Sequence, residues 1–182
     1  MLNHLKNSTC ISTWVPFNES WGQFHALDVE KHVRKFDSSR LIDHASGWSD
    51  RNGGDYYSRH FYFKKFSFSI KKAKKRILAL TEFGGYSLRL QEHSFNPEDI
   101  FGYKIYSTEQ ELNNAVYALY QDQVYPQIKN GLNVLVYTQV SDVEDEVNGF
   151  LTYDREILKI DIDMMKKINK ALSDRFIESF EK

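Results

Sequence analysis

The sequence is poor in the residues that cross-link a chain or carry it through a membrane. It has one cysteine, Cys10, among 182 residues, which excludes an internal disulfide and a cysteine-based metal site. No apolar run reaches the roughly 20 residues of a membrane-spanning helix, and the first ten residues lack the apolar core of a signal peptide. These absences predict a cytoplasmic protein without a membrane partner.

Neither sign of charge is in excess. The chain has 24 basic and 25 acidic residues and a net charge of −1, so no overall positive field would attract nucleic acid. The locally basic run Lys71–Arg76 is typical of a solvated helix end or a turn before a strand. Hydrophobic residues make up 41% of the sequence, which indicates a globular chain, and the length predicts a single domain, residues 1–182.

Strand-like segments alternate with helical segments along the chain. Apolar and aromatic runs predict strands at residues 10–17, 40–43, 56–63, 76–81 and 133–138. Apolar residues at helical spacing predict helices at residues 23–36, 109–130 and 163–180. The segments between them, including 44–55 and 83–107, are predicted to be loops. Buried strands that alternate with helices indicate βα units and a parallel sheet.

Several predicted helix ends carry capping residues. Thr108 and Glu111 have the Thr-x-x-Glu form of a capping box. Gly131 is placed to end the same helix. Either Asp161 or Asp163 is expected to cap the last helix.

Two architectures fit this alternation, an open doubly wound sheet and part of a (β/α) barrel. A doubly wound sheet usually has a glycine-rich phosphate loop after its first strand, and here Gly22 stands alone. Polar side chains instead follow the carboxyl ends of several predicted strands, where barrel enzymes place their chemistry. These residues are Asn18, Glu19, Asp43, His44, His60, Glu82 and Gln139. We therefore predict an α/β fold with parallel strands that forms part of a barrel.

Glu19 and Glu82 follow two different predicted strands. Each of them alone could simply cap the helix that follows. Parallel strands of one sheet end on the same rim, so the two side chains are expected to converge. Two carboxyl groups a few ångströms apart suit glycoside hydrolysis, in which one donates a proton and the other attacks the anomeric carbon.

Five segments together resemble the catalytic barrel of glycoside hydrolase family 2, which includes β-galactosidases and β-glucuronidases. They are, in chain order, WVPFNESWGQF, RLIDHASGWSDRNGGD, RHFYF, LTEFGGYS and VYTQVSDVEDEVNGFLTYDRE. The order and spacing of these motifs are more specific than any one of them. The resemblance covers strands four to eight of the barrel, so it implies a partial TIM barrel made of these strands and their helices.

The resemblance also implies roles for three residues. Glu19 would be the general acid/base, Glu82 would be the nucleophile, and Asn18 would bind the sugar 2-hydroxyl. It implies a retaining mechanism, for which the two carboxyl groups should lie about 5–5.5 Å apart. The implied substrate is a β-glycoside, with no cofactor and no metal.

Further residues in these motifs are candidates for substrate binding. His60 and Tyr62 could contact sugar hydroxyls, although His60 could equally be a core histidine. Trp48 could stack on a sugar or pack within its loop. Gln139 and Glu146 could reach the cleft from the last loop. The acidic residues of that loop could instead hold a cation, because hard cations prefer oxygen ligands; they are Asp142, Glu144, Asp145 and Glu146.

A half barrel leaves an open sheet with one uncovered face. Inward side chains would lack an opposite wall, among them Trp14, Leu78, Leu80 and Leu135. We expect the chain to form a homo-oligomer, to associate with the missing half of a barrel, or to rearrange. The alternative is that the sheet remains open and a terminal helix folds over it. Substrate positioning would be incomplete, so the isolated chain is expected to be weakly active or inactive. The alternative is a non-catalytic, carbohydrate-binding or interaction protein of the same fold.

Overall fold

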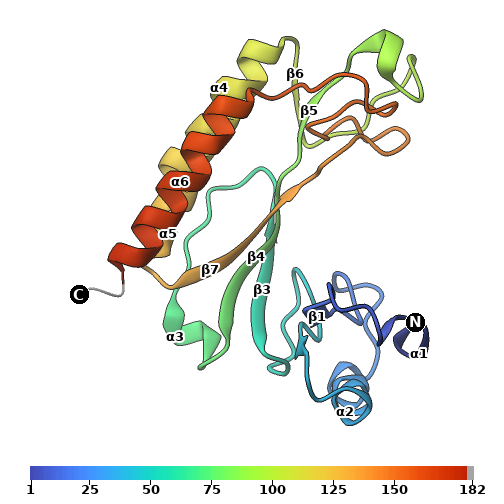
Figure 1. The fold of residues 1–182 in the computed structure, drawn as a ribbon, viewed down its shortest axis with the longest axis vertical. Helices are drawn as coiled ribbons and strands as arrows, with labels where there is room; N and C mark the ends of the chain where they lie inside the picture. Colours follow the sequence, from blue (N-terminus) through green and yellow to red (C-terminus); the bar gives the residue numbers. More distant parts are fainter. Residues whose placement is uncertain (180–182) are drawn as a thin grey trace. The chain divides into compact units, whose positions relative to one another are not determined.

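The computed structural model describes residues 1–179 and has a mixed α/β fold (Figure 1). Its strands are parallel and lie in open sheets, and the described residues form no closed barrel. None of the helices in this part of the chain has the length and apolarity needed to cross a membrane. The chain divides into two compact units. The first comprises Met1–His60, Ser69–Thr81 and Leu132–Leu135, and the second comprises Phe61–Phe68, Glu82–Gly131 and Val136–Lys182.

A short parallel ladder organises the start of the first unit. β1 (Thr13–Trp14) pairs with β2 (Leu41–Ile42), residue 13 opposite residue 41. An isolated bridge between Asn18 and Ser46 keeps the same offset of 28 residues. The predicted first strand is therefore present but interrupted. Pro16 has no backbone N–H to donate to the ladder, which accounts for the break.

The helices of the first unit are α1 (Leu2–Leu5) and α2 (Ala26–Phe36). α2 begins three residues later than the predicted helix at Gln23. The residue before it, His25, has a φ of 43° and a left-handed backbone conformation. A left-handed residue cannot continue a right-handed helix, so His25 sets the start of α2.

Trp14 lies at the centre of the core of the first unit. It is buried and packs with Val33 and Ile42. Its indole Nε1 donates a hydrogen bond to Asp37 Oδ2 at 2.9 Å, and the Arg40 guanidinium lies 5.4 Å from a ring centre. The prediction that Trp14 lacks an opposite wall is therefore wrong, because α2 supplies one through Val33.

The central strands form an open sheet with the order β3-β4-β7. They are β3 (Tyr56–Phe61), β4 (Ile77–Gly84) and β7 (Leu132–Thr138). β4 extends three residues beyond its predicted end at Thr81, so Glu82 lies within a strand rather than after it. Leu78 and Leu80 are fully buried, which contradicts the prediction that they lack a covering wall, and Leu135 is half-buried.

The basic run Lys71–Arg76 is the helix end and turn that the sequence predicts. It overlaps α3 (Ile70–Ala73) and continues into Lys74 and Lys75. Both lysines have left-handed backbones, with φ values of 53° and 70°. They end the helix and turn the chain into β4.

The predicted loop at residues 83–107 contains more secondary structure than expected. After the end of β4 it includes β5 (Tyr86–Leu88), the 3-10 turn η1 (Gln91–His93) and β6 (Lys104–Tyr106). β5 and β6 pair in parallel, residue 86 opposite residue 104. Both strands have three residues, and all three residues of β5 are buried. Such a short strand shows no alternation by which the sequence could reveal it.

Two helical stretches lie side by side in the second unit (Figure 1). They are formed by α4 (Glu109–Leu119), the π-helical turn η2 (Tyr120–Val124) and α5 (Tyr125–Ile128) on one side and by α6 (Ile162–Glu178) on the other. The Arg175 guanidinium lies 4.2 Å from the ring centre of Tyr125, whose hydroxyl donates to Ile168 O at 3.4 Å. The last predicted helix residue, Phe180, lies outside the described residues.

The helix caps confirm most of the sequence predictions. Thr108 Oγ1 accepts a hydrogen bond from Glu111 N at 3.2 Å, and Gly131 follows the helical stretch with a φ of 93°. Asp161 rather than Asp163 caps α6, because its carboxylate accepts from two backbone N–H groups of the first turn. The predicted apolar face of the first stretch is buried throughout, at Leu112, Val116, Leu119, Tyr120, Val124 and Ile128.

Lys159 is a fully buried cation that holds the last loop in place. Its Nζ donates to both carboxylate oxygens of Asp142, at 2.8 and 3.0 Å, and to the carbonyl oxygens of Leu88 and Val147. Gly149 N also donates to Asp142. Asp142 is therefore already neutralised by a lysine, which argues against the alternative of a cation site built on this residue.

Candidate functional site

Glu19 sits at the carboxyl end of the β1–β2 ladder in an unusual backbone conformation. Its φ is 59°, in the left-handed region that residues other than glycine rarely adopt. The conformation is held by a hydrogen bond from Glu19 N to Ser46 O at 2.8 Å, directly after the bridge between Asn18 and Ser46. Backbone strain of this kind clusters at functional sites, so the geometry singles out Glu19 within its segment.

Both carboxylate oxygens of Glu19 are engaged by ring nitrogens. His60 Nδ1 lies 3.2 Å from Oε1, and Trp21 Nε1 donates to Oε2 at 3.2 Å. The side chain of Glu19 is 12% exposed, while the ring of His60 is fully buried. The carboxyl group is therefore fixed in orientation but still open to solvent on one side. His60 is buried, as expected of a core histidine, and its ring lies against a candidate catalytic group. Its contact with a sugar stays a prediction.

Three residues around Glu19 offer exposed surface to a ligand. Asn18 is exposed and precedes Glu19 directly. Trp21 is 85% exposed and Trp48 is 48% exposed. The loop that carries Trp48 is tied to β3, because Arg59 donates to Trp48 O at 2.9 Å. The sequence singled out Asn18 and Trp48 as binding residues, and both have surface available for that role.

Glu82 in the second unit is oriented by a tyrosine. The Tyr62 hydroxyl donates a hydrogen bond to Glu82 Oε2. Burial, and then the bond to the neighbouring carboxylate, raise the pKa of Tyr62 well above its ordinary value. Tyr62 therefore stays protonated and remains a donor to Glu82 at any physiological pH. Tyr62, which the sequence predicts to bind sugar, contacts the candidate nucleophile.

The ring of Tyr62 stacks on the ring of Tyr103. The two ring centres lie 4.0 Å apart, the rings are nearly parallel at 13°, and Phe101 packs edge-on against Tyr103 at 5.8 Å. Gly85 makes room for the stack, since an added Cβ would lie 2.8 Å from Tyr62 and 3.0 Å from Tyr103. Gly85, the second glycine of the LTEFGGYS motif, thus allows Tyr62 its position. Tyr103 and Phe101 were not predicted, because no local pattern in their loop marks them.

Gln139 and Glu146 are brought together in the second unit, with Asn148 as a third member. Gln139 Nε2 donates to Glu146 Oε2 at 3.3 Å and to Asn148 Oδ1 at 2.7 Å. Asn148 Nδ2 lies 3.5 Å from the same Glu146 oxygen. Asn148 is buried and was not predicted. The three side chains satisfy one another, so their first role is to fix the loop after β7.

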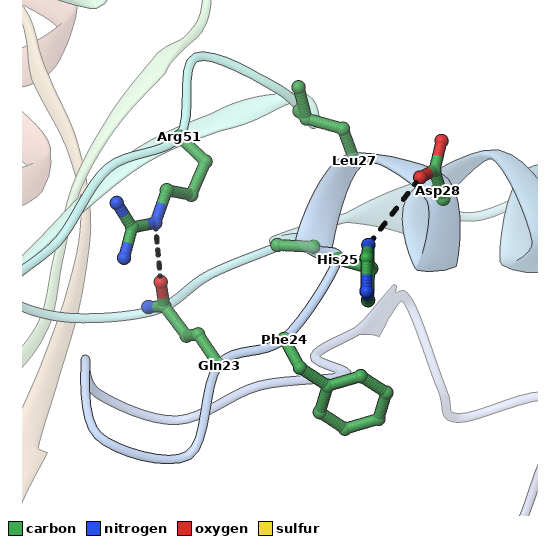
Figure 2. Close-up of a pocket in the computed structure, with 7 residues that line it drawn as sticks. Gln23, Phe24, His25, Leu27, Asp28 and Arg51 are labelled. Atoms are coloured by element: carbon green, nitrogen blue, oxygen red, sulfur yellow. Dashed lines mark hydrogen bonds and ion pairs between the residues drawn. The ribbon is translucent and has the colours of Figure 1, made fainter.

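A pocket of about 390 Å³ lies on the chain shortly after Glu19 (Figure 2). Its walls come from residues 23–28 and from Arg51, whose Nε donates to Gln23 Oε1 at 3.0 Å. On the other side, His25 Nδ1 lies 4.0 Å from the carboxylate of Asp28. The residues predicted from the sequence to form the site do not line this pocket.

A surface group of histidine and acidic side chains is the arrangement in the second unit that resembles a metal site. His93 Nδ1 lies 2.7 Å from Asp154 Oδ2 and 3.9 Å from Glu156 Oε2. The pKa of Asp154 is lowered chiefly by the hydroxyl of Thr152, with His93 adding to the effect. Asp154 is thus satisfied by protein donors, and the group is partly or fully exposed.

Each unit holds one oriented carboxylate at or near the carboxyl end of a strand. Glu19 in the first unit accepts from the indole of Trp21, and Glu82 in the second accepts from the hydroxyl of Tyr62. Glu19 and Glu82 belong to different units, so the separation of about 5–5.5 Å stays a prediction. No protein-family model matches the chain, and no curated protein matches it.

Proposed function

We propose that the chain carries the catalytic carboxylates of a retaining β-glycosidase and that its fold corresponds to strands four to eight of a (β/α) barrel. The observation that carries the proposal is the hydrogen bond from the Tyr62 hydroxyl to Glu82 Oε2. A neutral donor on one oxygen orients the Glu82 carboxylate, which would act as the nucleophile. Glu19 is proposed as the partner carboxyl group. Its left-handed backbone and its contacts with the rings of His60 and Trp21 support this role, because they fix the orientation of its side chain.

The reaction would have two steps. In the first, Glu82 attacks the anomeric carbon while Glu19 gives its proton to the glycosidic oxygen, so the bond to the leaving alcohol breaks and a glycosyl ester of Glu82 forms. In the second, Glu19 takes a proton from water, the resulting hydroxide attacks the anomeric carbon, and the ester bond breaks. Tyr62 would stabilise the departing carboxylate of Glu82, because its hydrogen bond strengthens as negative charge returns.

A panel of aryl β-glycosides tests the proposal. The chain is assayed alone and in its full-length context, with β-galactosides, β-glucuronides and β-mannosides, since the sugar depends on parts of a barrel that the resemblance does not cover. We expect Glu82→Gln to abolish turnover, while Glu92→Gln, which changes an exposed glutamate of the same unit, leaves it unchanged. A 2-deoxy-2-fluoro aryl glycoside should add the mass of one sugar to Glu82. Undiminished hydrolysis by Glu82→Gln would exclude this mechanism.

A second candidate is a carbohydrate-binding protein without hydrolytic activity. The exposed rings of Trp21 and Trp48 favour it, because flat aromatic faces suit stacking on sugars. This candidate predicts sugar binding that survives Glu82→Gln, with no hydrolysis in any context, and tryptophan fluorescence during a sugar titration would detect it. Association into a homo-oligomer or with the missing half of a barrel belongs to either candidate and is measured by light scattering on a sizing column.

A further inference from the structure

His60 is the link between Glu19 and a buried hydroxyl. One ring nitrogen, Nδ1, lies 3.2 Å from Glu19 Oε1, and the other, Nε2, lies 2.8 Å from Ser46 Oγ. The Thr81 hydroxyl lies 3.2 Å from Ser46 Oγ. Ser46 and His60 are both buried, so the Ser46 hydroxyl is held among protein groups rather than in solvent. Four residues of the first unit therefore form one continuous chain of hydrogen bonds.

Gly47 fixes the ring of His60 from one face. Its φ is 101°, which residues with a side chain rarely adopt. A Cβ at this position would lie 2.9 Å from Nδ1, 3.0 Å from Cε1 and 3.2 Å from Cγ of His60. The backbone of residue 47 thus lies directly against the imidazole. Together with the Ser46 contact, it determines that Nδ1 rather than another ring atom faces Glu19.

A hydroxyl suits both tautomers of this ring, because it can donate and accept. A neutral imidazole has one N–H donor and one acceptor nitrogen. When Glu19 is ionised, Nδ1–H donates to it and Ser46 donates to Nε2. When Glu19 is protonated, it donates to Nδ1, and Nε2–H donates to Ser46. Because a hydroxyl both donates and accepts, the contact between His60 and Glu19 can be kept in both forms.

We propose that Ser46 is a positioning residue for Glu19, which it orients through His60. The inference rests on the proposed function, because a general acid/base of a retaining glycosidase must act once protonated and once ionised. A fixed donor or a fixed acceptor at position 46 would favour one of the two forms. Ser46 lets the same geometry serve both half-reactions.

Nitrogen NMR of the histidine rings tests the part of the inference that does not depend on activity. In ¹⁵N-histidine-labelled protein at neutral pH, the His60 signals are assigned by their loss in His60→Asn. We expect one protonated and one unprotonated ring nitrogen, with well-separated shifts. In Ser46→Ala, Nδ1–H should still donate to the ionised Glu19, while the Nε2 shift should move away from the Nδ1 shift, because Nε2 loses the hydrogen bond from Ser46. Ser46→Thr, which restores a hydroxyl, should return the Nε2 shift toward the wild-type value.

Ser58→Ala is the matched control. Ser58 is as buried as Ser46 and lies on β3 with His60, but its hydroxyl donates to Asp43. Asp43 and His60 interact electrostatically, so Ser58→Ala disturbs His60 only through Asp43. Ser46→Ala removes the hydrogen bond to Nε2 itself, and comparison of the two variants separates these effects. If Ser46→Ala does not fold, Ser46→Gly, which also removes the hydroxyl, is used in its place. Unchanged His60 shifts in the folded variant, or an equal change in Ser58→Ala, would overturn the proposal.

A kinetic measurement tests the consequence for Glu19. Proton donation matters most for poor leaving groups, so a misplaced Glu19 should slow hydrolysis of phenyl glycosides more than that of dinitrophenyl glycosides. We expect kcat/KM of Ser46→Ala to fall by about tenfold more for the phenyl substrate. An equal loss for both substrates contradicts a role through Glu19. If the wild type hydrolyses neither substrate even in its full-length context, the proposed function fails, while the NMR result still decides whether Ser46 orients His60.

Discussion

Replacing Asp43 with asparagine should make the protein more stable at alkaline pH. Asp43 is buried and its Oδ1 accepts a hydrogen bond from Ser58 Oγ at 2.8 Å. Its Oδ2 is buried without a hydrogen-bond partner among the described residues. Burial raises the pKa of Asp43 to about 6, more than Ser58 and the charge of His60 lower it. The neutral acid is thus the form that the folded protein prefers, and asparagine is its neutral analogue.

The size of the effect follows from the difference in pKa between the folded and unfolded chain. The ordinary value of 3.8 is raised to about 6, a difference of about two units, which corresponds to about 3 kcal/mol at 1.36 kcal/mol per unit. Between these two pKa values the folded state binds more protons than the unfolded state, so the free energy of unfolding falls as pH rises. The loss begins above pH 4 and is complete above pH 6.

Urea unfolding followed by circular dichroism at pH 4, 6 and 8 measures this difference. We expect Asp43→Asn and the wild type to have similar stability at pH 4. At pH 8 the variant should be more stable by about 3 kcal/mol. Asp99→Asn, which changes an exposed aspartate, serves as the control and should follow the wild-type curve. The reasoning is refuted if Asp43→Asn is the less stable protein at pH 8, or if its stability falls with pH as steeply as that of the wild type.

Two further stability predictions concern the second unit. Lys159→Met should lower the free energy of unfolding by about 3–5 kcal/mol, because it leaves the Asp142 carboxylate buried without its cation. Chemical unfolding measures this loss. The double variant Lys159→Met/Asp142→Leu should lose less stability than the single variant. Thr108→Ala should cost about 1 kcal/mol through loss of the bond to Glu111 N, measured as a lower unfolding midpoint, whereas Thr108→Ser should keep most of the stability; equal losses in both would exclude the cap as the cause.

The sequence predicts those parts of the fold that depend on neighbouring residues. The helix at residues 162–178 is an example, since its apolar spacing and the Asp161 cap are both local features. The turn at Lys74 and Lys75 was likewise foreseen from a run of charge. The pair β5 and β6 was missed because each has three residues and its partner lies 18 residues away in the chain. Their stability comes from that distant pairing rather than from the residues themselves.

The candidate site shows the same division. Glu19 and Glu82 were proposed from the sequence because polar residues directly after apolar strands form a recognisable pattern, and their roles stay predictions. Ser46 was not predicted, because a serine in a polar loop carries no local signal. Only the fold shows that it is buried and in contact with His60. Tyr103 was missed for a similar reason, since only the folded loop brings its ring against Tyr62. Residues that orient other side chains leave little trace in a single sequence.

The π-helical turn η2 has a consequence for how this chain tolerates changes in length. A π turn takes up one residue more than an α turn, and each residue of an α-helix rotates the chain by about 100°. Loss of one residue within 120–124 would convert the turn to α-helix and leave both flanking helices facing as they do now. Loss of one residue within α4 would turn the buried side of that helix toward solvent. Natural deletions in this helical stretch should therefore be confined to η2.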